Sequence, residues 1–317
     1  MWLPIAILAY FMNAGVYTAD KYFLSKKIHS SIAYAFYVGI WSIGNITLFL
    51  FTPFFLPDWR WLVLDLAAGF LFLAALIAWY KALHQSEATK VVPIVGAFIP
   101  VYSFLLSYIF LGQGLSQKEL LALFILIIGG ILISIKQKKE SRLKKVWHNI
   151  MIFFGSSKSE LHPVGRLIIN SLVAAFIFAA YYVLIKYIYL NQPFLSSYIW
   201  TRMGSFLGAL FLLVPLNNRK VILEKKKRRS AIKSWPLFLS IRFLAVVAFI
   251  LLNYAISLGN VALVNALQGV QYVFLIVIFV ILSEAYPKIL KEEMGKTVLI
   301  QKFMGVLLMG VGLYLLI

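Results

Sequence analysis

Two arginines lie inside long apolar stretches of this 317-residue sequence. Arg202 and Arg242 each stand about eight residues into such a stretch. An ionisable side chain in hydrocarbon costs about 3 kcal/mol or more, so each guanidinium must face a water-filled cavity or a partner. Because the planar guanidinium matches a carboxylate or a phosphate, we predict that both arginines bind an anionic group of a ligand. The structural alternative is pairing with a helix-end carbonyl or with a carboxylate such as Asp65.

Amides and phenols in the apolar segments form a second group of candidate site residues. Buried amides in lipid need partners, so these side chains should face other helices, where they either bond a neighbour or line a pocket. Asn13 with Tyr17, and Gln268 with Tyr272, are four residues apart and share a helix face. With the two arginines they make up the predicted substrate cavity: Asn13, Tyr17, Tyr182, Arg202, Arg242, Asn253, Asn265, Gln268 and Tyr272.

Four further charged residues lie at the ends of apolar segments. Asp20 and Glu87 are candidates for ion coupling, because a carboxylate can carry a proton; the alternative is that they are solvated or paired. Lys21 and Lys186 lie 165 positions apart. We expect both lysines to extend along the helix toward the membrane interface, as long basic side chains do.

Enzyme motifs are absent from the sequence. Gly295-Lys296-Thr297 resembles the end of a phosphate-binding loop, but the glycine required five residues earlier is Leu290. The four histidines are scattered without metal-ligand spacing, there is no cysteine, and no Gly-x-Ser-x-Gly elbow occurs. We therefore expect no enzymatic activity, no ATP-driven pump, no cofactor and no bound metal.

The composition indicates a membrane protein. The chain is 62% hydrophobic and 13% charged, whereas soluble domains are about half apolar and a quarter charged. A membrane-spanning helix needs about 20 mostly apolar residues. We predict an all-α membrane protein whose first segment is a span and not a removed signal. The ten predicted transmembrane helices are Trp2–Phe23, Ile32–Leu50, Trp59–Tyr80, Val91–Leu111, Gln117–Ile135, Val164–Tyr189, Phe194–Leu216, Trp235–Ile256, Val261–Leu282 and Val298–Ile317.

The basic residues predict an orientation. Most of the 30 lysines and arginines fall in the connections after the odd-numbered segments. The positive-inside rule places these connections in the cytoplasm of a cell (plasma) membrane protein, with both termini outside. The net charge of +19 therefore indicates anionic lipid headgroups as a partner, not nucleic acid. Within the central basic stretch, Leu143–Phe154 is either a short interfacial helix or a solvated tether.

The two halves of the chain resemble each other. At an offset of 165, Lys21 matches Lys186 and Gly39 matches Gly204, and weaker matches continue in order at larger offsets. A duplicated unit of five spans must re-enter the membrane from the opposite face, which gives an inverted repeat. We predict a first repeat at residues 1–135, a basic cytoplasmic linker at 136–163 and a second repeat at 164–317, with a substrate site between them.

Several stretches are similar to the signatures of EamA-type proteins of the drug/metabolite transporter superfamily. They are Ile99-Pro100-Val101, Leu111-Gly112-Gln113-Gly114-Leu115-Ser116 and the run from Asn253 to Leu267, followed by Leu282-Ser283-Glu284. The resemblance implies ten helices in two inverted five-helix repeats, and export or uptake of small metabolites. The sequence departs from the family pattern at Gln271, where a proline is expected, and in its charge pattern, which reverses the usual orientation.

Together these features predict a secondary transporter for a small, anionic or zwitterionic metabolite. It would work by alternating access around the first, third, fourth, sixth, eighth and ninth helices. The alternative is a flippase or membrane-embedded transferase for a lipid-linked substrate, because aromatic residues make up 16% of the chain and basic loops suit a polyprenyl-phosphate headgroup. A closed polar cavity favours the first function, and a lipid-facing slot favours the second.

Overall fold

A computed structural model describes residues 1–26, 30–85, 88–134, 163–223, 235–285 and 296–317, and these residues contain helices and no strand. The stretch Leu143–Phe154 lies outside them. The elements are α1 (Trp2–Lys26), α2 (Ser31–Trp41), the 3-10 helix η1 (Ser42–Leu50), α3 (Trp59–Gln85), α4 (Ala88–Leu111), α5 (Gln117–Ser134), α7 (Pro163–Asn191), α8 (Phe194–Phe211), α9 (Leu216–Leu223), α11 (Trp235–Leu258), α12 (Val261–Ala266), α13 (Gln268–Ala285) and α15 (Lys296–Leu316).

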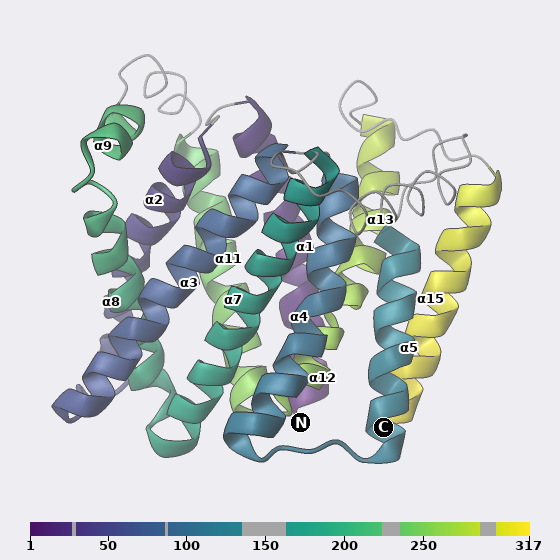
Figure 1. Cartoon of the computed structure of the whole chain (residues 1–317), viewed down its shortest axis with the longest axis horizontal. Helices are drawn as coiled ribbons and strands as arrows, with labels where there is room; N and C mark the ends of the chain where they lie inside the picture. The colour runs from purple at the N-terminus through teal and green to yellow at the C-terminus, as the bar shows by residue number, and fades with distance from the viewer. Residues whose placement is uncertain (27–29, 86–87, 135–162, 224–234, 286–295) are drawn as a thin grey trace, which may run out of the picture.

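The long helices lie side by side in one bundle, and both termini lie at the same edge of it (Figure 1). Among the described residues, six helices are long and apolar enough to cross a membrane, or seven if α8 and α9, bent by 100°, count as one span. The protein is therefore an all-helical membrane protein. Each of the ten predicted segments is covered by one helix or by two consecutive ones, but ten crossings in an inverted repeat remain a prediction.

Helix starts follow from short capping sequences. Ser30 Oγ accepts a 3.3 Å hydrogen bond from Ala33 N at the start of α2. At α5, Ser116 and Glu119 form a reciprocal capping box, with Ser116 N donating to Glu119 Oε2 at 2.8 Å and Glu119 N donating to Ser116 Oγ at 3.3 Å. Gly112, with a φ of 63°, ends α4 in the left-handed conformation that glycine adopts without strain.

Three segments predicted as continuous helices are interrupted. The second changes from α to 3-10 at Ser42, where Asn45 Nδ2 bonds the Ser42 carbonyl at 2.9 Å and so competes with the regular helix ladder. The seventh bends between α8 and α9. The ninth breaks at Leu267, between α12 and α13. That break lies one turn before Gln271, the position where the family pattern has a proline.

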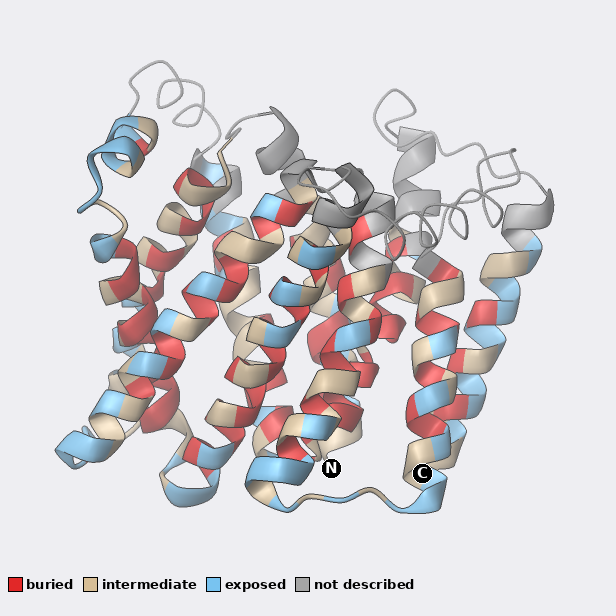
Figure 2. Ribbon diagram, in the orientation of Figure 1, coloured by how far each residue is buried: buried red, intermediate tan, exposed pale blue. Residues whose placement is uncertain are grey.

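Small residues set how closely the helices approach. A Cβ added at Gly204 of α8 would overlap the backbone of Leu66 in α3, and one at Gly69 of α3 would overlap the carbonyl of Thr201. The α3 and α8 backbones are therefore in direct contact, as small residues permit in membranes. Buried residues face the interior of the bundle while exposed ones cover its outside (Figure 2). Many of these exposed side chains are large and apolar, such as Phe110 and Phe243, which suits a surface in contact with lipid.

Candidate substrate cavity

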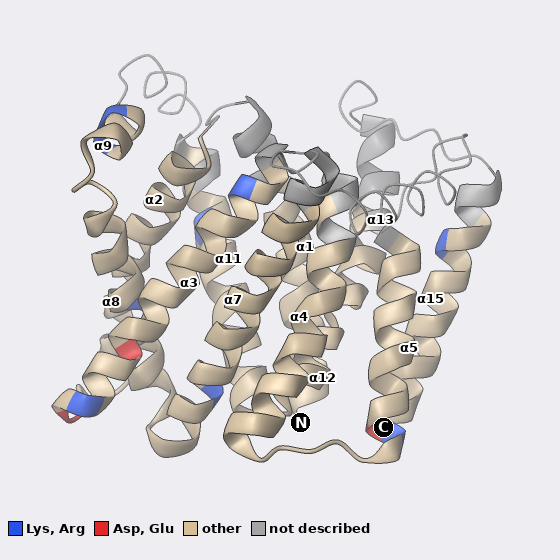
Figure 3. Cartoon of the chain, in the orientation of Figure 1, with Lys and Arg blue, Asp and Glu red and all other residues tan. Residues whose placement is uncertain are grey.

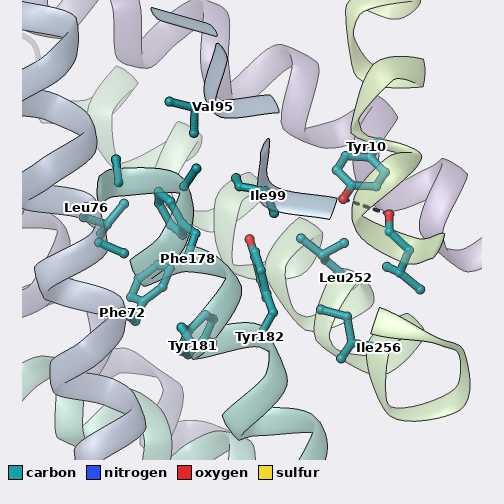
Figure 4. Packing of buried hydrophobic residues seen from close by; sticks show 14 of the residues in the cluster. Tyr10, Phe72, Leu76, Val95, Ile99, Phe178, Tyr181, Tyr182, Leu252 and Ile256 are labelled. Carbon is teal, nitrogen blue, oxygen red and sulfur yellow. Dashed lines mark hydrogen bonds between the residues drawn. The ribbon is translucent and has the colours of Figure 1, made fainter. Parts of the chain in front are cut away.

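A cavity of about 230 Å³ lies inside the bundle. Its walls come from α1, α2, η1, α3 and α4 in the first half and from α7, α8, α11 and α13 in the second. Much of the lining is aromatic. Figure 4 shows Phe72, Phe178 and Tyr182 gathered with aliphatic side chains such as Leu76 and Ile99. The polar lining consists of Ser42, the amides Asn13, Asn45, Gln268 and Gln271, tyrosine hydroxyls, and the guanidinium groups of Arg202 and Arg242.

Arg202 is the most enclosed charge in this cavity. Its side chain is 3% exposed, and its Nη2 donates a 2.7 Å hydrogen bond to the Tyr181 hydroxyl. The guanidinium carbon lies 4.3 Å from the ring centre of Phe72 and 4.6 Å from that of Phe249. Aromatic faces attract a cation but cannot neutralise it. Among the described residues no carboxylate lies within ion-pairing distance of Arg202, and its Nε has no hydrogen-bond partner.

A hydrogen-bond network holds Arg202 in place. The hydroxyls of Tyr181 and Tyr189 both donate to Asn253 Oδ1, at 3.4 and 3.0 Å, and Asn253 Nδ2 donates to the Phe249 carbonyl at 2.7 Å. The network joins α7, α8 and α11, and the side chains of Tyr181, Arg202 and Asn253 in it are buried. Because the Tyr181 hydroxyl donates its proton to Asn253, its oxygen is held where it accepts the hydrogen bond from the Arg202 guanidinium.

Arg242 lines the same cavity from α11. Its Nη2 donates a 3.4 Å hydrogen bond to the hydroxyl of Tyr34 in α2, and its guanidinium carbon lies 5.9 Å from the ring centre of Tyr34. Tyr34 in turn packs edge-on against Tyr80 of α3, with ring centres 4.8 Å apart. Arg242 therefore connects the two halves of the chain at the cavity wall.

Six of the predicted cavity residues line the cavity: Asn13, Tyr17, Tyr182, Arg202, Arg242 and Gln268. Three others do not. Asn253 belongs to the network behind Arg202, and Asn265 Nδ2 donates to Ser103 Oγ at 2.8 Å, which joins α12 to α4. Tyr272 is buried against Gly96 of α4, where an added Cβ would overlap its hydroxyl. The side chain of Asp20, and Glu87 as a whole, lie outside the described part of the structure.

The prediction for Lys186 was wrong. Its side chain is 4% exposed and does not extend to the interface; its Nζ donates to the carbonyls of Ser257 and Gly259, both at 2.9 Å. These carbonyls lie at the C-terminal end of α11, where helix carbonyls lack intrahelical partners. Lys186 therefore satisfies the end of a neighbouring helix. The side chain of Lys21 lies outside the described residues.

Some lining residues were missed by the sequence analysis. Asn45 and Gln271 are buried amides in apolar segments, so the reasoning that selected Gln268 could have found them. The aromatic wall of Tyr10, Trp41, Phe72, Trp79 and Tyr80 gave no such signal, because aromatic side chains at helical spacing also suit a plain core. No group of three or more His, Asp or Glu side chains that could hold a metal occurs among the residues described.

The apolar helices define an integral membrane protein, and the cavity between them combines aromatic walls with two guanidinium groups. Residues 1–135 match the model of the EamA-like transporter family. This match confirms the resemblance to EamA-type proteins and indicates a membrane transporter of the drug/metabolite superfamily. None of the curated proteins compared with this sequence matches it.

The fold is shared with solved structures over the whole chain. One of them, described only as a crystal structure of a protein, superimposes with a TM-score of 0.62 and 15% sequence identity. The superposition covers 98% of this chain and 93% of the other. At this identity the likeness shows the fold alone, and it covers both halves of the chain.

Proposed function

We propose that this protein is a secondary transporter that moves a small anionic or zwitterionic metabolite across the membrane by alternating access. The cavity would be the substrate site, with Arg202 and Arg242 binding the negative group. The amides of Asn13, Gln268 and Gln271 would bind its other polar atoms, and the aromatic wall would contact its apolar part. A cavity of about 230 Å³ is large enough for a molecule of amino-acid size.

Arg202 is the observation that carries this proposal. A buried cation is costly unless it is paired, and the described residues give Arg202 rings and one hydroxyl but no anion. A structural arginine would be expected to find a carboxylate or a helix-end carbonyl. An anionic substrate would supply the missing charge, and it would meet a guanidinium already held in position by Tyr181.

The helix contacts support ten spans in two inverted repeats. In the predicted repeat, α7, α8, α11, the pair α12 and α13, and α15 correspond in this order to α1, α2, α3, α4 and α5. The contact of α3 with α7 then corresponds to the contact of α11 with α1, and both contacts occur. Helices that correspond to each other are also in contact, namely α2 with α8, α4 with α12, and α5 with α15. This symmetry of the contacts suits a transport cycle in which each half takes up the conformation of the other half when the central site opens to the opposite face of the membrane.

The charge distribution supports an orientation. Both termini lie at one edge of the bundle, and the described helices carry few charged residues over most of their length (Figure 3). We propose that the termini face outward in the plasma membrane, with the basic connections at the cytoplasmic face near anionic lipid headgroups.

The test is a thermal-shift screen of the purified chain, because a ligand that binds only the folded form raises its apparent stability. The panel contains small carboxylates, phosphates and zwitterionic amino acids, each with a neutral amide or alcohol of the same shape. We expect stabilisation by an anionic or zwitterionic member but not by its neutral partner, and counterflow of that member in proteoliposomes. Stabilisation only by polyprenyl phosphates would instead favour the flippase, and equal stabilisation by charged and neutral partners would overturn the anion site.

A further inference from the structure

Asp65 is a buried carboxyl group that has no ionic partner among the residues described. It lies on α3, about two turns from the start of that helix, and its side chain is 0% exposed. Gln192 Nε2 donates a 3.4 Å hydrogen bond to Asp65 Oδ2, while Oδ1 has no hydrogen-bond partner in the described part of the chain. No lysine, arginine or histidine of the described residues forms an ion pair with it. A permanently charged carboxylate would be expected to have better partners at such a position.

The charged and titratable groups on the neighbouring helices do not neutralise Asp65. On α7, the Lys186 ammonium is bound to two backbone carbonyls, and the Tyr189 hydroxyl donates to Asn253. On α8, the titratable groups on this side are Tyr198 and Arg202, and Arg202 donates to Tyr181. The backbones of α3 and α8 touch next to both residues, because a Cβ added at Gly204 would meet the Leu66 backbone and one at Gly69 would meet the Thr201 carbonyl. Asp65 and Arg202 thus lie on facing stretches of two packed helices, without an ion pair between them.

This arrangement couples the charge at Asp65 to the charge in the cavity. An anion that binds at Arg202 would bring a second negative charge near an ionised Asp65. Like charges disfavour the ionised form of a carboxyl group, most strongly in a region removed from water. Uptake of one proton by Asp65, which converts the carboxylate into a carboxylic acid, would remove this repulsion. Release of the anion would reverse the step and return the proton.

We propose that Asp65 binds one proton together with the anionic substrate and releases it with the substrate, which makes the carrier a proton–anion symporter. This inference rests on the proposed function and adds its coupling ion. By linkage, the proton and the anion strengthen each other's binding by the same factor. Asp65→Asn, which resembles the protonated carboxyl in shape and charge, should bind the anion without requiring a proton.

The first experiment needs no ligand. Infrared difference spectra of the purified full chain, recorded along a pH titration, report the carbonyl stretch of protonated carboxyl groups. We expect a pH-dependent band that is missing in Asp65→Asn but present in Asp58→Asn. Asp58 is an exposed aspartate just before α3, so it is a matched control. Spectra of Asp65→Asn that are identical to those of the wild type would show that Asp65 does not titrate, and would overturn the proposal.

The second experiment uses benzoate, with benzamide as its neutral control, between about pH 6 and pH 9, where benzoate is anionic. We expect the affinity of the wild type and of Asp58→Asn for benzoate to rise by up to about tenfold per pH unit as the pH falls. Asp65→Asn should bind benzoate with an affinity that no longer changes with pH. Unchanged pH dependence in Asp65→Asn would contradict the coupling while leaving the anion site intact. Failure of the wild type to bind benzoate or any anion at any pH would overturn the proposed function itself.

Discussion

Tyr17 of α1 and Tyr182 of α7 stand 165 positions apart in the chain, and both line the cavity. The offset is the one that relates Lys21 to Lys186 and Gly39 to Gly204. One tyrosine comes from the first half and one from the second, so two positions separated by the predicted repeat offset line the same cavity. This is the arrangement expected of a substrate site between two repeated units.

An inverted repeat with outward termini makes a prediction for labelling from each side of the membrane. Because the chain has no cysteine, single cysteines can be introduced without interference. We expect Ile317→Cys, at the exposed C-terminal end, to react in intact cells with a reagent that cannot cross the membrane. Lys220→Cys, on the exposed part of α9, should react only after the cells are opened. The reverse pattern would show that the family's usual orientation overrides the charge pattern.

The contact between α3 and α8 predicts a stability effect at Gly204. A leucine side chain there would meet the Leu66 backbone, which cannot move aside as a flexible side chain could. We expect Gly204→Leu to lose about 1–3 kcal/mol of stability, as overpacked interiors do, and to melt at a lower temperature in detergent. Gly310→Leu is the matched control, because nothing lies within 4 Å of a Cβ at Gly310. Equal melting of the two variants would contradict the close approach of α3 and α8.

The position of Lys186 predicts a second stability effect. Removing its ammonium leaves the carbonyls of Ser257 and Gly259 without this donor, and an unsatisfied buried acceptor costs about 1–3 kcal/mol. We expect Lys186→Met, which keeps the aliphatic length, to lower the melting temperature. Lys118→Met, at an exposed site on α5, should have no effect. If Lys186→Met melts like the wild type, the lysine does not secure the end of α11.

The sequence predicts where the helices lie because long apolar runs have few other solutions in lipid. It does not predict the break at Leu267 or the change at Ser42, since both depend on local backbone hydrogen bonds inside uniformly apolar segments. It identifies Arg202 and Arg242, whose charge makes burial costly. It cannot separate Gln268, which lines the cavity, from Asn253 and Asn265, which bond other side chains. The rotation of each helix decides that difference, and the rotation follows from packing with distant segments.

Lys186 illustrates the same limit for charged residues. A lysine near the end of an apolar segment can extend to the interface, and its sequence neighbours do not exclude this. The carbonyls that it binds belong to Ser257 and Gly259, more than 70 positions away. Only the packing of α7 near the junction of α11 and α12 brings them within reach.

The measurement that tests the central claim most directly compares the binding of a charged ligand and its neutral analogue to variants of Arg202. We predict that Arg202→Gln loses about 1.5–3 kcal/mol of binding to the anionic ligand from the thermal-shift screen, as expected for a hydrogen bond to a charged group. Binding of the neutral analogue should not change, and Arg60→Gln, at an exposed site on α3, should bind like the wild type. Arg202→Lys should recover only part of the loss, because lysine lacks the planar fork. If folded Arg202→Gln binds the anion as tightly as the wild type does, Arg202 is a structural residue and the cavity is not an anion site.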